Sequence, residues 1–424
     1  MSTARTTDPT TCWGDYDRDD PFPLFAAVRE AGSVHDVTLA DGHRAFLVVG
    51  YDAAREALNH PDLSKDMHAA LARDGAVVAE GLPGPAFARH MLSVDPPDHT
   101  RLRALTAPAF TRTRLATLEP RIHEIVDHLL DELEDRTAPV DLVAGFAAPL
   151  PFIVIGELLG IARPDQVRLA GWFATLLAPY DGDAPPPDVV AASDRIVGFL
   201  TDLADRATAS AAAGEADGTL VGDLAAASHR GELTRDELLS TLFQLIVAGH
   251  DTTTSLIGNG TVALLTNPAQ RDALVADPAL VPGAIEEMLR FDAPVPHATF
   301  RYAERDTTIA GTAVPAGVQV LVSLATAGRD PHRSVAPDSF DVTRPSPAHL
   351  AFGHGVHHCL GARLARMEAQ VAFTALLGRF PTMTLAVPAN ELRWGHGDGL
   401  VLRGLDALPV HLSTPGPERQ DTRT

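Results

Sequence analysis

The decapeptide FGHGVHHCLG, residues 352–361, places three histidines, three glycines and one cysteine within ten residues. Its histidines and Cys359 could each in principle coordinate a zinc ion. Tetrahedral zinc sites usually combine two closely spaced ligand sets, and the only other cysteine of the chain is Cys12. Taken alone, the decapeptide leaves a metal site, a redox centre and an ordinary turn open, so the rest of the chain must decide.

The composition limits the class of protein. The chain has 424 residues, of which 45% are hydrophobic, so it can bury a large core. Acidic residues outnumber basic ones by 55 to 34, and the net charge of -21 argues against nucleic acid as a partner. No apolar run reaches the roughly 18 residues that cross a bilayer, and the N-terminus lacks the apolar stretch of a signal peptide. We therefore expect a cytoplasmic protein with no membrane partner.

Two strand-forming patches flank a mainly helical middle. Residues 34–49 alternate apolar and polar side chains around Asp41-Gly42, which predicts a β-hairpin. Residues 307–324 hold short β-branched runs interrupted by glycines, which predicts further strands. Residues 118–135 repeat apolar side chains at three- and four-residue spacing, as an amphipathic helix does. Because no long linker divides the chain, we expect one large domain, mainly α with small β-sheets.

Residues 234–266 predict one long helix with an unusual centre. Thr234 and Glu237 match a capping box, and Asn267-Pro268 ends the pattern. The middle reads AGHDTTT. Threonines that bond to carbonyls one turn earlier, at a kink, would explain this run. Asp251 beside a hydroxyl favours a second interpretation, in which a groove opens in the helix and protons are delivered to a small ligand.

Several charged residues are candidates for a role in binding or structure. Glu287 and Arg290 lie three residues apart on one helical face with apolar neighbours, which favours a partly buried ion pair. Five other basic residues stand singly and are candidates for holding an anion, although exposed surface positions would explain them equally well: His99, Arg103, Arg301, Arg329 and Arg344.

Together, AGHDTT on a long helix, EMLR about 35 residues later and the decapeptide about 60 residues further on resemble the signature set of the cytochrome P-450 superfamily. The resemblance is completed by DPPDHTRLR, TAGRDP and HLAFGHG and runs from about residue 20 to residue 412. The closest likeness is to soluble bacterial members that tailor macrolides and other polyketides. The family pattern Phe-Gly-x-Gly-x-His/Arg-x-Cys-x-Gly is met at Phe352, Gly353, Gly355, His357, Cys359 and Gly361.

The resemblance implies the cytochrome P-450 fold, with a single large domain over residues 21–412. Residues 1–20 and 413–424 would be flexible. Haem b would lie between the long central helix and the helix that follows the cysteine loop, with Cys359 as the axial ligand of its iron. Because Cys359 precedes a helix, we expect backbone N–H groups and the helix dipole to lower the pKa of its thiol.

The resemblance also assigns roles to the other motifs. Asp251 and Thr252 would deliver protons to dioxygen, in a space left by Ala248 and Gly249. A buried structural network would consist of Glu287, Arg290 and Arg344. The residues around the haem would be His99, Arg103, Arg301, His349 and His357 at its propionates, and Phe352, Gly353 and Gly361 beneath the porphyrin.

We therefore expect a monooxygenase that inserts one oxygen atom of O2 into a bulky hydrophobic metabolite, by hydroxylation or epoxidation. A macrolide or related polyketide is the leading substrate class, and a steroid, terpenoid or peptide is the alternative. His297 would be one polar handle in a mostly apolar pocket. By position relative to the family motifs, the pocket residues would be Met91, Leu92, Leu176, Leu177, Leu245, Val295, His297, Leu400 and Val401.

The expected partners follow from the same resemblance. Electrons would arrive from a ferredoxin and an NAD(P)H-dependent ferredoxin reductase, and the protein would be a monomer. An acidic ferredoxin could dock on a basic face despite the acidic total charge, with electrostatics mainly setting the encounter rate. That face would be formed by Arg112, Arg114, Arg363 and Arg366.

Three alternatives lead to different chemistry. A zinc site would need a second ligand set, which the cysteines do not provide. A relative without catalysis, which only recruits partners, should lack the thiolate or the proton-relay pair, whereas this chain keeps Cys359, Asp251 and Thr252. A peroxygenase that uses hydrogen peroxide would not need Thr252. The sequence therefore favours a haem-thiolate monooxygenase.

Overall fold

The structure is a computed structural model, and it describes residues 13–40, 42–66, 84, 87–136, 139–178, 184–215, 218–345, 347–395 and 400–412. The segment 13–20 belongs to the N-terminus that we expected to be flexible. Trp13 is instead 1% exposed, and its backbone N–H donates to the carbonyl of Thr38 at 2.7 Å. Trp13 is thus packed within the fold, and the flexibility of residues 13–20 stays a prediction. Residues 1–12 and the expected tail, residues 413–424, lie outside the described part of the chain.

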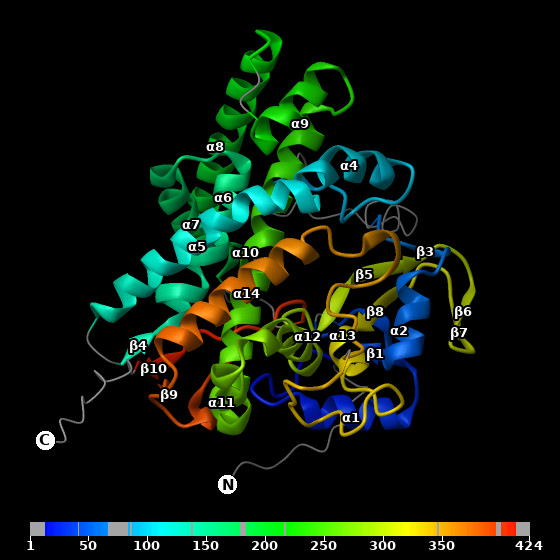
Figure 1. Ribbon diagram of the computed structural model, residues 1–424. Coiled ribbons are helices and arrows are strands. Elements are labelled where there is room, and N and C mark those ends of the chain that lie inside the picture. The colour runs from blue at the N-terminus through cyan, green and yellow to red at the C-terminus, as the bar shows by residue number, and fades with distance from the viewer. Residues whose placement is uncertain are drawn as a thin grey trace, which may run out of the picture.

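Long helices build the larger part of the molecule (Figure 1). Helix α10 runs through the middle, and α14 lies beside it, so the two motif-bearing helices are neighbours (Figure 1). The longest helices are α5 (Arg112–Glu134), α7 (Arg163–Leu177), α8 (Pro187–Ala212), α10 (Arg235–Thr266) and α14 (Ala362–Arg379). Two shorter helices, α6 (Pro149–Leu159) and α9 (Leu220–His229), pack against α10.

Shorter helices surround this assembly. The short α-helices are α1 (Phe22–Ala31), α2 (Tyr51–Leu58), α4 (Asp98–Thr106), α11 (Pro268–Ala276), α12 (Val281–Phe291) and α13 (Leu324–Gly328). One π-helical segment, η3 (Val143–Ala147), precedes α6. The 3-10 turns are η2 (Ala107–Phe110), η4 (Pro278–Leu280), η5 (Gly355–His357) and η6 (Ala389–Glu391).

The strands form small sheets, as the sequence predicted. The five-stranded sheet has the order β1 (Val34–Thr38), β2 (Arg44–Val48), β8 (Gln319–Ser323), β5 (His297–Ala303) and β3 (Leu63–Ser64). The other sheets are β4 (Val140–Asp141), β10 (Pro409–His411) and β9 (Thr384–Leu385), and the hairpin of β6 (Thr307–Ile309) and β7 (Thr312–Val314).

The hairpin expected at residues 34–49 is confirmed, because β1 and β2 pair antiparallel from Val34↔Val48 to Thr38↔Arg44. The expected turn residue Asp41 lies outside the described residues. Strand β2 then pairs in parallel with β8, from Ala45↔Gln319 onward. This parallel pairing joins the two strand-forming patches, which lie far apart in sequence, in one sheet.

Helix α10 has the predicted extent of 32 residues and the predicted capping box at Thr234 and Glu237. Hydroxyls in its centre donate to carbonyls one turn earlier, as in Thr252 Oγ1 to Ala248 O at 2.9 Å. The local interpretation of the threonine run is thus confirmed in its hydrogen bonds. Among the described residues, no helix is long and apolar enough to span a membrane.

Candidate active site

A cavity of about 410 Å³ lies between the centre of α10 and the loop that carries Cys359. Helix α10 contributes Ala248, Gly249 and Thr252 to its wall, while Cys359 lines it from the loop. The two motifs are about 110 residues apart in sequence and face the same space. The other loop residues that line the cavity are Phe352, Gly353, His354, His357, His358, Leu360 and Gly361.

Two glycines shape the cysteine loop. Gly353 and Gly355 have φ angles of +72° and +75°, a region that side chains other than glycine rarely adopt. A Cβ atom on Gly355 would also lie 2.7 Å from Asn59 Oδ1. The loop closes on itself because the Cys359 N–H donates to the carbonyl of Phe352 at 2.8 Å. The glycines therefore let the loop fold tightly and present Cys359 to the cavity.

The thiol of Cys359 is solvent-accessible yet enclosed, because it faces the cavity rather than the outer surface. Burial raises the pKa of the Cys359 thiol, and the backbone N–H groups of Gly361 and Ala362 and the charge of Arg103 oppose that rise. We had expected a net lowering of this pKa. In the protein alone burial is the larger effect, and a metal ion would be needed to hold the thiolate, since a coordinating thiol is deprotonated outright.

At one end of the cavity, basic side chains gather: His99, Arg103, Arg301 and His357 all line it. The rings of His99 and His357 lie 4.3 Å apart between centroids. Both ring nitrogens of His99 are buried without a hydrogen-bond partner in the described structure, and Nε2 of His357 lies 3.9 Å from Asp95 Oδ1. Burial, together with the nearby charges of His357 and Arg103, lowers the pKa of His99 to about 4.

These observations test whether the residues fit haem b. The thiol of Cys359 lines one wall of a mainly apolar cavity. At one end of the cavity lie arginine side chains and the ring nitrogens of His99, which have no hydrogen-bond partner in the described structure. Haem b presents an iron that takes a thiolate ligand and two carboxylates that take hydrogen bonds from such donors. Cys359 therefore fits the iron of haem b, and the basic residues at the end of the cavity fit its carboxylates.

The structure corrects the expectation for His349. Its Nε2 lies 3.0 Å from Glu286 Oε2, and its Nδ1 accepts the N–H of Ala351 at 3.2 Å. Both ring nitrogens are thus engaged, and His349 is absent from the described residues that line the cavity. It belongs to a local ion-pair cluster that also contains Arg366, which binds Glu286 at 2.6 Å.

Of the nine expected pocket residues, five line the cavity: Met91, Leu92, Leu245, Val295 and Val401. His297 does not, because successive side chains of a strand point to opposite faces and its neighbour Ala298 is the one that faces the cavity. His297 is fully buried, packs edge-on against Trp13, and bonds to the carbonyl of Leu400 at 2.9 Å.

Leu176, Leu177 and Leu400 are also absent from the lining within the described residues. Leu176 packs against the main hydrophobic core, and Leu177 is 36% exposed at the end of α7. Leu400 packs against the separate cluster that contains Trp13. Leu176 and Leu400 are thus used for packing and Leu177 is exposed, which the motif spacing alone could not resolve.

Asp251 and Thr252 take different positions on α10. The Thr252 side chain lines the cavity, whereas Asp251 is 4% exposed and lies behind the wall. His250 Nδ1 lies 2.8 Å from Asp251 Oδ1. The Asp251 carboxyl group therefore lies next in sequence to the cavity-lining Thr252 and contacts the imidazole of His250.

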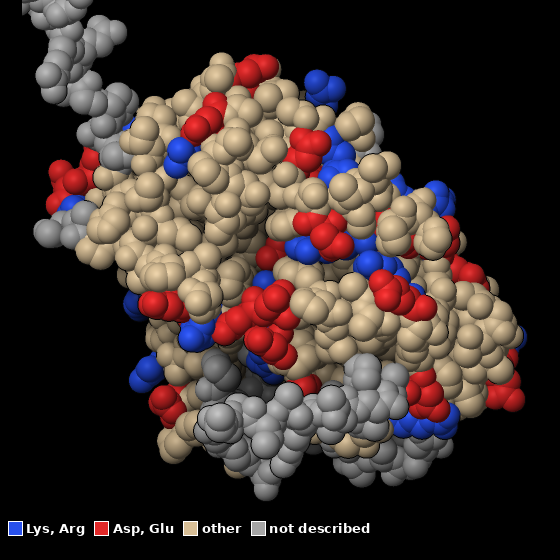
Figure 2. Space-filling model, turned by 90° about the horizontal axis from the view of Figure 1, so that it is seen from below, with Lys and Arg blue, Asp and Glu red and all other residues tan. Residues whose placement is uncertain are grey.

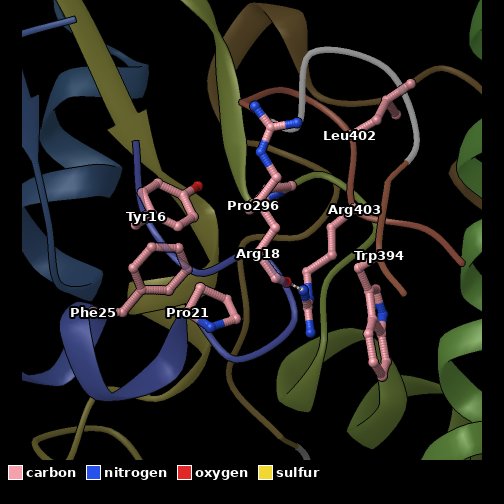
Figure 3. A pocket seen from close by; sticks show the side chains of 8 residues that line it. All are labelled: Tyr16, Arg18, Pro21, Phe25, Pro296, Trp394, Leu402 and Arg403. Carbon is pink, nitrogen blue, oxygen red and sulfur yellow. Dashed lines mark hydrogen bonds between the residues drawn. The ribbon is translucent and has the colours of Figure 1, made fainter. Parts of the chain in front are cut away.

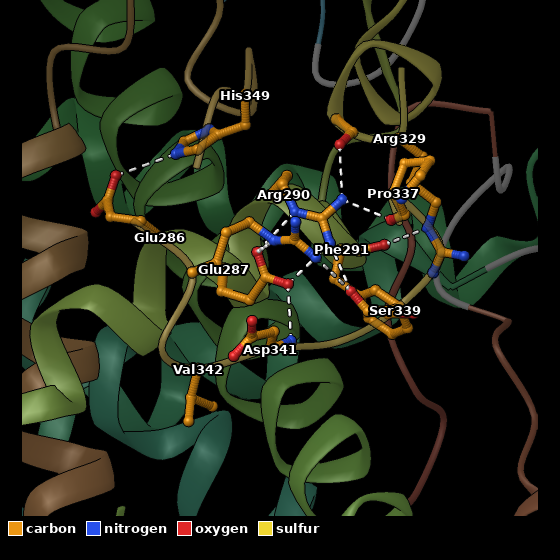
Figure 4. Close-up of polar contacts among 12 residues, drawn as sticks. Glu286, Glu287, Arg290, Phe291, Arg329, Pro337, Ser339, Asp341, Val342 and His349 are labelled. Atoms are coloured by element: carbon orange, nitrogen blue, oxygen red, sulfur yellow. Dashed lines mark hydrogen bonds and ion pairs between the residues drawn. The ribbon is translucent and has the colours of Figure 1, made fainter. Parts of the chain in front are cut away.

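The buried network is present as expected (Figure 4). Arg290 donates to both carboxylate oxygens of Glu287, at 2.6 and 2.8 Å, and Arg344 donates to Glu287 at 3.0 Å. The side chains of Glu287 and Arg290 are 0% exposed. The carbonyls of Gly328, Pro337 and Ser339 accept the remaining bonds of Arg290, so the donors of this guanidinium are widely satisfied within the protein.

Among the cavity residues that the sequence interpretation missed, three carry buried polar groups that bear on the site. Gln244 on α10 has a buried Oε1 without a partner, and Glu368 on α14 has a buried Oε2 without one, among the described residues. Burial raises the pKa of Glu368 to about 8. Lys65, just after β3, is 5% exposed. Glu368 occurs two residues after Arg366 in a plain helical pattern, and the other two lie outside the quoted motifs, so no local signal marked them.

The proposed basic docking face is only partly available. Arg366 binds Glu286 at 2.6 Å and stacks over the ring of Phe352 at 4.4 Å, so this side chain is engaged in the fold. Arg112 and Arg363 are exposed. On the face seen in Figure 2, acidic and basic side chains are interspersed, with no continuous basic surface.

Two further features bear on alternative sites. A second pocket, beside Phe25, Arg403 and Trp394, holds about 10 Å³, which is room for a water molecule but not for an organic ligand (Figure 3). Across the described residues, no group of three or more His, Cys, Asp or Glu side chains is arranged to hold a metal ion. The zinc interpretation of the decapeptide therefore finds no support.

Comparisons with known proteins point in one direction. A profile of the family described as Cytochrome P-450 matches residues 276–391. Cytochrome P-450 monooxygenase PikC of Streptomyces venezuelae is 42% identical over 396 residues, which cover 92% of this chain and 91% of that protein. Vitamin D(3) 25-hydroxylase of Pseudonocardia autotrophica is 40% identical over 400 residues, covering 94% of each. The tirandamycin C-bound P-450 monooxygenase TamI superposes with a TM-score of 0.82 at 41% identity and covers 93% of this chain and 98% of that chain.

Proposed function

Since the chain belongs to the cytochrome P-450 family, a family of haem b monooxygenases, we propose that it hydroxylates or epoxidises a bulky, mainly apolar secondary metabolite. A macrolide or related polyketide is the leading substrate class. TamI, which binds tirandamycin C, and the polyketide-biosynthesis protein PksS of Bacillus subtilis, 33% identical over 401 residues, support this class by their similarity over nearly the whole chain. The hydroxylase of vitamin D(3) supports the alternative, a steroid-like substrate.

The observation that carries this proposal is the lining of the cavity. Its wall combines Cys359 and Thr252 with a mainly apolar surface that includes Met91, Leu245 and Val295. Such a surface favours a large hydrophobic molecule with few polar groups. Gln244 would accept a hydrogen bond from one of the polar groups of the substrate, since its Oε1 has no partner in the described structure. Gln244 thus replaces His297 as the polar handle.

Each residue of the site has a distinct task. Haem, when bound, supplies the activation of oxygen. Cys359 would bind its iron through Sγ, and the arginines and histidines at the end of the cavity would bind its carboxylates. The Thr252 hydroxyl, which donates to Ala248 O at 2.9 Å, would turn to hold a proton donor inside the cavity. Asp251, next to His250, would resupply that proton.

For electron delivery, we propose a ferredoxin. Arg112 and Arg363 are exposed and would attract an acidic partner. Charge reversal at both positions should slow reduction while leaving substrate affinity unchanged, whereas reversal at Arg366 should also disturb the bond to Glu286. Stopped-flow reduction with a bacterial ferredoxin tests this assignment, and unaltered reduction rates would contradict it.

The substrate class is tested by spectral titration of the haem protein with a panel of macrolides, other polyketides, steroids and peptides. A spectral shift followed by an oxygenated product from a macrolide or polyketide would support the leading class. Turnover of steroids alone would support the alternative. Gln244→Leu should weaken binding of the accepted substrate about tenfold. Thr254→Val is the matched control, because Thr254 bonds to His250 O and does not line the cavity.

The proton-delivery role has its own test. Thr252→Val keeps the shape of the side chain and removes its hydroxyl, so product formed per electron consumed should fall at least tenfold. Thr254→Val should leave that ratio unchanged. Equal product yields from both variants would contradict the role of Thr252, and product formation with hydrogen peroxide as efficient as with the electron donor would indicate a peroxygenase.

A further inference from the structure

Lys65 is the only lysine in the sequence, and all other residues counted as lysine or arginine are arginines. The side chain lies in the wall of the cavity and is only 5% exposed. Lysine is rarely buried in this way without a partner for its charge. The position of this single ammonium group therefore calls for a physical explanation.

Neutral groups hold the Lys65 ammonium in place. Its Nζ donates to the carbonyl of Thr299 at 3.0 Å, to the carbonyl of Phe300 at 3.1 Å and to the hydroxyl of Thr299. These acceptors match the three donors of an ammonium group. The backbone N–H of Lys65 is bound by Asp95, at 3.0 and 3.1 Å. The group is firmly positioned, but its hydrogen bonds to oxygen atoms of Thr299 and Phe300 do not neutralise its charge.

A second buried cation converges on the same atom. Arg301 Nη1 also donates to the Thr299 carbonyl, at 3.3 Å. The Arg301 side chain lines the cavity, and neither it nor Lys65 forms an ion pair with a described residue. Burial, and then the charge of Arg301, lower the pKa of Lys65, and burial lowers the pKa of Arg301 to about 10. Two cations thus meet at one carbonyl oxygen, and no described carboxylate forms an ion pair with either of them.

Among the residues that the structure describes, the charges around this end of the cavity do not balance. Lys65, Arg301 and Arg103 supply three positive charges at the lining. Asp95 is the carboxylate whose charge acts on both Lys65 and Arg301. Three cations and one carboxylate leave an excess of two positive charges, which equals the charge of the two carboxylates of haem b.

We propose that Lys65 is a further residue of the haem site, whose ammonium shares with Arg301 the compensation of one haem propionate. This inference rests on the proposed haem-thiolate function and adds a residue to it. Thr299 has the supporting role: its carbonyl and hydroxyl groups hold the ammonium at the cavity wall. If Lys65 served only to tie the segment after β3 to β5, the carboxylates of haem would not influence it.

The test compares haem with haem dimethyl ester, in which both carboxylates are neutral. In Lys65→Met, transfer of haem to excess apomyoglobin should be about tenfold faster than in the wild-type protein. With the dimethyl ester the two proteins should lose the cofactor at equal rates. Lys65→Arg should restore part of the retention of haem. Arg305→Met is the matched control, since Arg305 is a 70% exposed cation paired with Asp62 and should have no effect.

Two outcomes would overturn the proposal. Unchanged loss of haem from Lys65→Met would show that the ammonium does not act on the cofactor. A loss accelerated equally with haem and with its ester would assign Lys65 to packing. The absence of a haem-thiolate spectrum from the wild-type protein would instead contradict the proposed function, so the two failures are distinguishable.

The wild-type protein offers a second measurement, which does not depend on whether a variant folds. Because Lys65 is the only lysine, an amine-reactive reagent followed by peptide mass spectrometry reports on it without interference from other side-chain amines. Propionates keep the ammonium protonated and unreactive, so labelling should be several-fold faster in protein loaded with the dimethyl ester. Equal labelling rates with the two cofactors would overturn the proposal.

Discussion

Two buried groups of charges, both built around arginines, differ in how their charges are balanced. In the network of Glu287, Arg290 and Arg344, the carboxylate binds both guanidinium groups. Backbone carbonyls accept further bonds from Arg290 (Figure 4). At the end of the cavity, Lys65 and Arg301 meet at the Thr299 carbonyl without an ion pair among the described residues. Among the described residues, the charges of the first group are balanced, and the second group has an excess of positive charge. Burial of charge alone therefore does not identify a binding site, whereas an uncompensated excess that faces a cavity does.

The largest expected effect comes from opening the complete network. Glu287→Gln leaves Arg290 and Arg344 buried without their carboxylate, which should cost about 3–5 kcal/mol of folding free energy. We expect little haem-loaded protein, and a lower urea midpoint for any that is recovered. A variant with wild-type stability and haem content would show that the network is not structural.

Besides these two groups of charges, the cavity holds Glu368, a buried carboxyl group whose pKa is raised. A group that keeps its proton in the folded state up to about pH 8 makes the folded protein less stable as pH rises above the unfolded pKa of about 4.5. Glu368→Gln cannot ionise, so its stability relative to wild type should increase by about 1.4 kcal/mol per pH unit well below pH 8, and by about 2 kcal/mol in all from pH 6 to pH 8. Urea unfolding of both proteins across this range checks the prediction, and a constant difference would contradict it.

Removing one cation from the unbalanced group should act on the cofactor rather than on the fold. For Arg301→Met, we expect haem to dissociate about tenfold faster, which corresponds to about 1.4 kcal/mol. The far-ultraviolet circular dichroism of the variant should match that of the wild type, because the other cations of the group remain. Loss of the folded structure would show that Arg301 resembles Arg290 in its role.

The smallest effect is expected at Glu286, the sequence neighbour of Glu287. Its carboxylate pairs with His349 and Arg366, but its side chain is 28% exposed. The Arg366 and His349 partners lower the pKa of Glu286 to about 2 against the opposing effect of burial. Solvent screens such a pair, so Glu286→Gln should cost at most about 1 kcal/mol. A cost equal to that of Glu287→Gln, by urea unfolding, would remove the distinction between paired charges that are fully buried and those that are not.

Local sequence signals predicted the regular elements well. The capping box at Thr234 fixed the start of α10, and the alternation at residues 34–49 predicted β1 and β2. The pairing of Glu287 with Arg290 followed from their spacing of three residues on one helical face. Each of these features depends on residues close together in the chain, which is why a local pattern could reveal them.

The errors have a common physical origin. His297 and His349 were assigned from their distance to a motif, but strand alternation turns one away from the cavity and Glu286 binds the other. The pKa of Cys359 was judged from the helix that follows it, whereas burial of the thiol has the larger effect. The direction of a side chain and its degree of burial depend on what packs around it.

The sequence by itself determined the helical framework, the family resemblance and the position of the candidate thiolate ligand, because these features are encoded in spacing along the chain. Only the tertiary structure decided that the single lysine, 236 positions before Arg301, would converge with it on one carbonyl oxygen. That encounter requires the segment after β3 to lie against β5. Electrostatic interactions act through space, so the charge balance of the cavity becomes visible only when distant segments are brought together.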